Sequence, residues 1–156
     1  MSNDHRGNIW TSFLKEELET LLPEDLFFKH DKFSQSKFNV LRGIHGDNKS
    51  WKLVTCVFGE IYQVVIDLRK KSKTFGQSFS IELSEKNCLS LYIPEGFAHA
   101  YYSISDLNII YYKLSNYYYP KYEDGIIWND PSVKNIWPTK KPLLSKKDKN
   151  LKDISN

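Results

Sequence analysis

Residues 51–68 constrain the fold most, because they hold two apolar strand-like runs with a single turn signal between them. The runs are WKLVTCVF and EIYQVVID, and we expect them to pair as a hairpin that turns at Gly59. Because side chains alternate along a strand, Lys52, Val54 and Cys56 share one face. A lysine on an otherwise apolar face is costly unless that face lines a site or meets an anion. This stretch therefore predicts a sheet with a functional site near Lys52.

Short strand-like runs continue on both sides of this stretch, with Gly, Asn, Ser or Pro between them. We expect strands near residues 26–32, 38–42, 51–58, 60–68, 77–84, 89–93, 100–105 and 108–115. Eight short strands with this spacing favour a sandwich or jelly roll. Alternating β and α units are excluded, because no helical segment separates the runs.

The two ends of the chain have a different character. Residues 11–22 predict a helix, capped by Thr11 or Ser12 and stopped by Pro23, with leucines at helical spacing. After residue 120 the pattern is loop-like, and a lysine-rich tail begins at Lys140.

Composition bounds the class of protein. A chain of 156 residues predicts one domain, residues 1–156, and the 15% aromatic content favours a β-rich interior. A net charge of +3 is too small to indicate nucleic acid but suits a small anionic ligand. Cys56 and Cys88 form no metal-spaced cluster, and no run has the length of a membrane span or the form of a signal peptide. These features predict a cytoplasmic protein with reduced thiols and no membrane partner.

Several motifs occur in a fixed order: LRGIH, KLV, GEIYQVVIDLR, IPEGFAHA, YYKLSNYYYP, GIIWND, WP and LLSKKD. Together they resemble the nucleotide-sugar 3,5-epimerases typified by dTDP-4-dehydrorhamnose 3,5-epimerase, a cupin-type jelly-roll family. The resemblance runs from about Arg6 to Asp148. It implies an all-β fold with a short N-terminal helix and a C-terminal loop or helical tail, assembled as a homodimer. It further implies a cofactor-independent isomerase that inverts C3, C5 or both in a nucleotide-diphosphate-linked 4-keto-6-deoxy sugar, for surface polysaccharide synthesis.

Epimerisation beside a ketone needs a base, a group that stabilises the enolate oxygen, and an acid on the opposite face. The resemblance assigns these roles to His45 as base, Asp148 as the carboxylate that orients it, Lys52 at the oxyanion and Tyr112 as acid. The residues alone favour a turn histidine at position 45 and a solvated charge at Asp148, and only the resemblance gives His45 and Asp148 their catalytic roles. Lys52 could extend to water and Tyr112 could be a core residue. Strand alternation adds that Tyr111 and Tyr112 cannot both face a cavity.

Substrate contacts are also implied by the resemblance. It places Arg42, Asn39, His99, Tyr117 and Arg6 in substrate binding. Arginine suits a diphosphate because its planar fork donates two hydrogen bonds at once. A tyrosine can stack on a nucleotide base, although loop packing is the alternative for Tyr117. Arg6 lies in a turn of the Asp-x-Arg-Gly type, which follows an additional N-terminal strand in the family; we expect that strand, and its dimer contact, to be missing here.

Two departures leave the substrate open. Thymidine-using members carry Tyr-Gln after the base histidine and a Glu near the N-terminus, where this chain has Gly46-Asp47 and Thr11. The strings GNIWT, FKHDKF, NVLRGIHGD and KLVTCVFGE resemble more closely the GDP-4-keto-6-deoxy-heptose epimerases. The nucleotide, the sugar and the number of inverted carbons therefore stay open.

Three other functions compete with epimerisation. A metal-dependent cupin needs clustered histidines and a glutamate, whereas here Gly46-Asp47 follows His45 and the other histidines are scattered, so we expect no metal. A nucleotide-sugar 3,4-ketoisomerase would use the same enolate chemistry. A non-catalytic sugar-nucleotide-binding cupin would not need all four of the proposed catalytic side chains.

Overall fold

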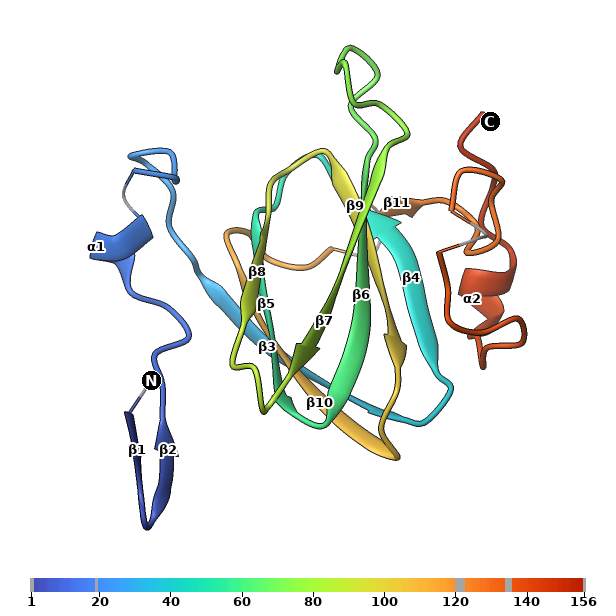
Figure 1. Cartoon of the computed structure of the whole chain (residues 1–156). Helices are drawn as coiled ribbons and strands as arrows, with labels where there is room; N and C mark the ends of the chain where they lie inside the picture. The colour runs from blue at the N-terminus through green and yellow to red at the C-terminus, as the bar shows by residue number, and fades with distance from the viewer. Residues whose placement is uncertain (1, 19, 120–122, 134–135, 156) are drawn as a thin grey trace.

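The computed structural model describes residues 2–18, 20–119, 123–133 and 136–155. Two antiparallel sheets face each other as a barrel-like jelly roll (Figure 1). One sheet has the order β3 (His30–Lys37), β10 (Leu107–Leu114), β5 (Lys52–Phe58) and β8 (Ser90–Ile93). The other has the order β11 (Asp124–Gly125), β4 (Leu41–Gly46), β9 (Phe97–Ser103), β6 (Glu60–Asp67) and β7 (Ser78–Ser84). The all-β, cupin-type prediction is confirmed.

The predicted pairing of β5 with β6 is wrong, although both strands exist at the expected residues. β5 pairs with β10 and β8, whereas β6 pairs with β9 and β7 in the opposite sheet. Gly59 therefore turns the chain from one sheet into the other. Each strand is central in its sheet and covered on both faces, which explains its nearly continuous apolar sequence.

The first two predicted strands are also displaced. The structure has strands at His30–Lys37 and Leu41–Gly46 in place of 26–32 and 38–42, so the RGIH motif lies within β4 and not on a loop. The chain turns at Asn39, whose φ is 64°. The polar run HDKFSQSK gives a weak strand signal because its inward side chains, Ser34 and Ser36, are small and polar.

The N-terminal segment stands away from the barrel (Figure 1). It contains a hairpin of β1 (Ser2–Asp4) and β2 (Gly7–Ile9), followed by α1 (Lys15–Leu18). The predicted helix over 11–22 is wrong in length, because only this single turn forms among the residues described there; residue 19 is outside them. No side chain of α1 is buried, and isolated short helices are marginal in water.

Two apolar cores hold the jelly roll together. One fills the space between the sheets and includes Val54, Ile110 and Tyr112. The other lies between the outer face of the five-stranded sheet and the C-terminal segment, where Val133 and Trp137 are buried. The C-terminal segment packs over this sheet and carries α2 (Lys146–Lys149) beside β4 (Figure 1). Asp148 is therefore buried and is not the solvated charge that its lysine neighbours suggest. Within the described ranges both helices are single turns, too short to cross a membrane.

The sheet-to-sheet turn gives a stability prediction. Gly59 has φ +78°, and a Cβ there would stand 2.8 Å from Asn108 Oδ1 and against the carbonyl of Leu107. Gly76 has nearly the same φ, +77°, but a Cβ would meet only Ile154 Cδ1 at 3.8 Å. We expect Gly76→Ala to lower the free energy of unfolding by about 1–2 kcal/mol, the cost of the left-handed backbone. Gly59→Ala should cost roughly 1–3 kcal/mol more, because of steric overlap.

Urea unfolding of both variants measures the difference. Equal losses in Gly59→Ala and Gly76→Ala would show that the close approach to β10 does not restrict this turn.

Candidate active site

A cavity of about 450 Å³ opens at one end of the barrel, between the two sheets. The five-stranded sheet contributes Arg42, His45 and His99 to its wall, and the four-stranded sheet contributes Lys32, Lys52 and Tyr112. Residues from the C-terminal segment and from the segment after β10 complete the rim. The structure thus brings the four predicted catalytic side chains, His45, Asp148, Lys52 and Tyr112, to one cavity.

An irregularity in β4 turns two motif residues toward this cavity. Arg42 pairs with Tyr101 and His45 pairs with His99, a register shift of one residue between them. Regular alternation would place residues three apart on opposite faces, and the shift puts both on the inner face. Gly43 permits it, because a Cβ there would lie 2.6 Å from Ala100 Cβ and 2.7 Å from the His99 carbonyl oxygen. The glycine of the RGIH motif is therefore a packing requirement.

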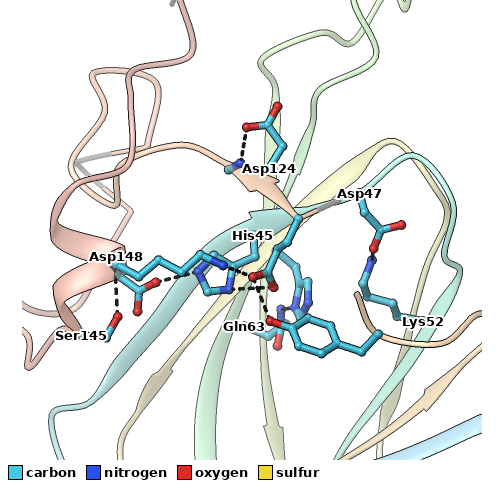
Figure 2. A network of polar contacts seen from close by, with 12 residues as sticks. His45, Asp47, Lys52, Gln63, Asp124, Ser145 and Asp148 are labelled. Carbon is cyan, nitrogen blue, oxygen red and sulfur yellow. Dashed lines mark hydrogen bonds and ion pairs between the residues drawn. The ribbon is translucent and has the colours of Figure 1, made fainter. Parts of the chain in front are cut away.

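His45 is held by a carboxylate from the far end of the chain (Figure 2). Its Nε2 lies 2.6 Å from Asp148 Oδ1, and Asp148 is 3% exposed. Ser145 caps α2 by accepting from the Asp148 backbone N–H at 3.0 Å, which fixes the helix turn that carries the carboxylate. Burial works to raise the pKa of Asp148, but its hydrogen bond with His45 and the His45 charge outweigh burial and lower it. Nε2–H therefore donates to an ionised carboxylate, which leaves Nδ1 as the basic nitrogen.

Glu123 is a site residue that the sequence reasoning missed. Its Oε1 lies 3.4 Å from His45 Nδ1, and its Oε2 contacts Lys147 and accepts from the Tyr118 hydroxyl at 3.2 Å. The carboxylate thus stands in front of the nitrogen that Asp148 leaves free. Glu123 lies in a loop that follows residues 120–122, which are outside the described residues, and no motif spacing points to it.

Lys52 faces the cavity and has an acidic partner. Its Nζ donates to Asp47 Oδ2 at 3.0 Å and to the Ser50 carbonyl at 3.3 Å, and the residue is 8% exposed. Both conditions for placing a lysine on an apolar face are met here, since it lines a site and finds an anion. Burial acts to raise the pKa of Asp47, but the Lys52 charge and hydrogen bonds leave it below its ordinary value. Lys52 does not extend to bulk water.

Tyr112 and His99 are neighbours in the cavity wall, with ring centroids 6.0 Å apart. Burial raises the pKa of Tyr112 well above its ordinary value, so its phenol stays protonated at neutral pH. Burial lowers the pKa of His99 well below its ordinary value, and the charges of Lys52, His45 and Lys32 add to this effect. Tyr111 faces the other side of β10, as the alternation predicted.

The cavity rim carries aromatic rings and excess positive charge. Tyr117 lines it, as do its two neighbours Tyr118 and Tyr119. Lys32 is a second site residue that the sequence reasoning missed. Its Nζ lies 4.5 Å from the ring centroid of Tyr118 and 5.4 Å from that of Tyr112. The signal for it was the inward alternation of Lys32 with Ser34 and Ser36. Among the described lining residues, five are Lys or Arg and three are Asp or Glu, a balance that suits an anionic ligand.

Two predicted substrate-binding residues lie outside this cavity. Arg6 is on the exposed N-terminal hairpin, where its guanidinium pairs with Asp4 at 2.5 Å. Asn39 occupies the turn before β4, and its amide donates to the Lys141 carbonyl at 3.0 Å. Both motif residues of the family are present. Within a single chain, however, Arg6 forms a local ion pair and Asn39 forms a hydrogen bond in a turn. Among the residues that the structure describes, no group of three His, Cys, Asp or Glu side chains is placed to hold a metal ion.

Comparisons with known proteins point to one family. A family model described as dTDP-4-dehydrorhamnose 3,5-epimerase matches residues 1–156. The enzyme of that name from Salmonella typhimurium is 43% identical over 149 residues, covering 93% of this chain and 81% of the relative. The one from Escherichia coli K12 is 40% identical over 152 residues, covering 95% and 82%.

Solved structures show the same fold. The dTDP-6-deoxy-D-glucose-3,5-epimerase of Legionella pneumophila, in complex with dTDP-4-keto-L-rhamnose, superposes with a TM-score of 0.92 at 37% identity, covering 98% of this chain and 83% of that one. A 3'-monoepimerase from Streptomyces bikiniensis, in complex with dTDP-quinovose, has a TM-score of 0.92 at 29% identity, with 98% and 79% coverage.

The jelly roll, its cavity and these matches define an isomerase of the sugar-epimerase class. More specifically, the chain belongs to the dTDP-4-dehydrorhamnose 3,5-epimerase family.

The His45–Asp148 pair predicts a pH-dependent contribution to stability. Because the pKa of folded Asp148 is lowered, its carboxylate stabilises the fold above the unfolded-state pKa of about 4, and this contribution is lost as pH falls through the folded pKa. We expect Asp148→Asn to lower the unfolding free energy at pH 7 and to lower it progressively less below about pH 4.

Urea unfolding from pH 7 to pH 3 measures this effect, with Asp153→Asn as a control for an exposed carboxylate in the same tail. A deficit in Asp148→Asn that stays constant over this range would mean that the pair contributes no charge-dependent stability.

Proposed function

We propose that this protein epimerises a nucleotide-diphosphate-linked 4-keto-6-deoxy sugar through an enolate. The observation that carries the proposal is the presence, in one cavity, of a carboxylate-bound imidazole and a buried, protonated phenol on opposite sheets. A base and an acid that approach one ring from two walls are what inversion of a carbon requires. The family membership supports the same chemistry.

The first step is proton removal from the carbon beside the ketone. His45 Nδ1 accepts the proton, and Asp148 stabilises the imidazolium through Nε2–H. Glu123 stands 3.4 Å from Nδ1, so the sugar must displace this carboxylate before it can reach the base. The C–H electron pair moves into the enolate, whose oxygen accepts a hydrogen bond from Lys52 Nζ. Asp47 keeps Lys52 in place between turnovers.

The second step is reprotonation from the other face. Tyr112 delivers its phenolic proton to the enolate carbon and the carbonyl re-forms. His45 then releases its extra proton to solvent, and Tyr112 regains one from solvent. The adjacent ketone acidifies the carbon, so the chemistry needs no cofactor.

The rim suits a nucleotide diphosphate. The Nε–H of Arg42 donates a hydrogen bond to Ser36 Oγ at 2.9 Å. Arg42 also lines the cavity, where its planar guanidinium can bind a diphosphate. The half-exposed Tyr117 ring offers a stacking surface for the base. We propose the dTDP-linked sugar as first candidate, because the matched relatives carry dTDP names. A GDP-linked heptose is the alternative, because this chain has Gly46-Asp47 where thymidine-using members carry Tyr-Gln. A role in surface polysaccharide synthesis stays a prediction.

Deuterium incorporation tests the reaction and the roles together. In D₂O with a dTDP-linked 4-keto-6-deoxy sugar, the wild type should incorporate deuterium at C3, at C5 or at both, and NMR of the product identifies the carbon. We expect His45→Asn to reduce turnover by a factor on the order of 10² to 10⁴. Tyr112→Phe should form less inverted product while the substrate still exchanges deuterium.

Tyr111→Phe, on the outer face of β10, is the matched control for Tyr112→Phe. A His45→Asn variant that folds and retains wild-type turnover would remove His45 from the base role. A carbonyl that moves along the ring would identify a ketoisomerase, and absence of exchange with both dTDP- and GDP-linked substrates would favour a binding protein.

We also propose that the chain works as a homodimer. Phe33 projects from the outer face of β3, is 66% exposed and stacks near Tyr111 with ring centroids 5.1 Å apart. Part of the N-terminal segment covers the neighbouring end of this face through Phe13 and Phe28. Ile9 and other apolar side chains of that segment stay exposed. A second copy on this face would cover both sets, and could bring the hairpin that carries Arg6 to a neighbouring cavity.

Phe33→Glu should therefore shift the protein from dimer to monomer, because it places a charge on a face that would become buried. Light scattering after size-exclusion chromatography measures the mass. Phe79→Glu is the control, because Phe79 is a phenylalanine of β7 that is 56% exposed. A monomeric wild type, or a dimer unaffected by Phe33→Glu, would contradict this interface.

A further inference from the structure

A buried amide lies directly behind the cavity wall. Gln63 is on β6, is fully buried between the sheets and does not itself line the cavity. Its Nε2 is 3.2 Å from His99 Nδ1 and 3.2 Å from the Val64 carbonyl oxygen, while its Oε1 is buried without a partner among the described residues (Figure 2). The mechanism proposed above makes no use of this residue.

The two contacts of the amide nitrogen fix the protonation of the histidine. The Val64 carbonyl can only accept a hydrogen bond, so the NH₂ end of Gln63 must face it. The same NH₂ group then donates to His99 Nδ1, which must accept and therefore carries no proton. A reversed amide would place oxygen against oxygen at Val64. The single proton of a neutral His99 is thus on Nε2.

The surroundings of His99 favour this neutral form. His45 lies across the β4–β9 pairing, the positive charges of Lys52 and Lys32 act on the ring, and the Tyr112 ring packs against it. An imidazolium would add a third positive charge to this wall and would lose the hydrogen bond at Nδ1, because a protonated nitrogen cannot accept one. Among the described residues, no protein acceptor contacts Nε2.

We propose that Gln63 is a positioning residue that holds His99 as the neutral Nε2–H tautomer, so that His99 donates one hydrogen bond to a ligand oxygen in the cavity. The acceptor is an uncharged oxygen, a hydroxyl or carbonyl of the sugar ring, because Lys and Arg already supply charge for the phosphates. This identification of the ligand rests on the function proposed above, whereas the tautomer does not.

Imidazole ¹⁵N NMR reads the tautomer directly in the wild-type protein, with His99→Ala to assign the signals. We expect His99 to give the neutral Nε2–H pattern from pH 8 down to pH 5. A wild-type His99 that is protonated at pH 7, or that shows the Nδ1–H pattern, would overturn the proposal without the need for a variant.

Gln63→Met and Gln63→Glu keep the approximate size of the side chain. The first tests the hydrogen bonds of Gln63, and the second tests its lack of charge. Gln63→Met removes both hydrogen bonds, so we expect mixed Nδ1–H and Nε2–H signals. Gln63→Glu places a carboxylate at Nδ1, and the pH at which His99 titrates should rise by about one unit or more. An unchanged tautomer in Gln63→Met contradicts the positioning role, and that variant suffices if Gln63→Glu fails to fold.

Kinetics with the 4-keto sugar provide a separate readout. Gln63→Met should reduce kcat/KM by about tenfold or more at unchanged thermal stability, by analogy with the partners that orient metal-binding histidines. If no keto sugar is turned over, the proposed function fails while the NMR result still decides the tautomer. If the wild type is active and Gln63→Met retains full kcat/KM, the role of Gln63 is refuted although the function stands.

Discussion

A one-residue register shift between β4 and β9 decides what the cavity contains. With regular pairing, either Arg42 or His45 would face the outer core, and the cavity would lose its arginine or its imidazole. The shift depends on backbone contact at Gly43, where β9 leaves no space for a side chain. A feature of strand packing is therefore also the feature that assembles the site.

The second core links the end of the chain to the same site. Val133 and Trp137 bind the C-terminal segment to the outer face of the five-stranded sheet, which places α2 next to β4. Asp148 then reaches over the sheet edge to His45, 103 positions earlier in the sequence. Packing of this segment therefore also positions the carboxylate that orients the imidazole.

Two ion pairs hold charged side chains in the cavity wall. Lys52 is balanced by Asp47, and Asp148 is balanced by His45, so these two charged groups each have a counter-charge within hydrogen-bonding distance. Tyr112 stays protonated through burial, with no ionic partner needed. A net positive rim therefore surrounds an interior in which a neutral keto group can become an anion without large rearrangement of the protein.

The sequence by itself determined the local pattern: which residues of β5 and β10 face inward, and which ordered motifs identify the family. It could not determine that β5 and β6 belong to different sheets, because alternation records burial and not the pairing partner. The position of His45 within a strand, and that of Glu123 beside the base, were likewise decided only by tertiary structure. Those positions depend on register and on a distant loop packing over a sheet edge, and interactions through space leave no periodic trace in a linear sequence.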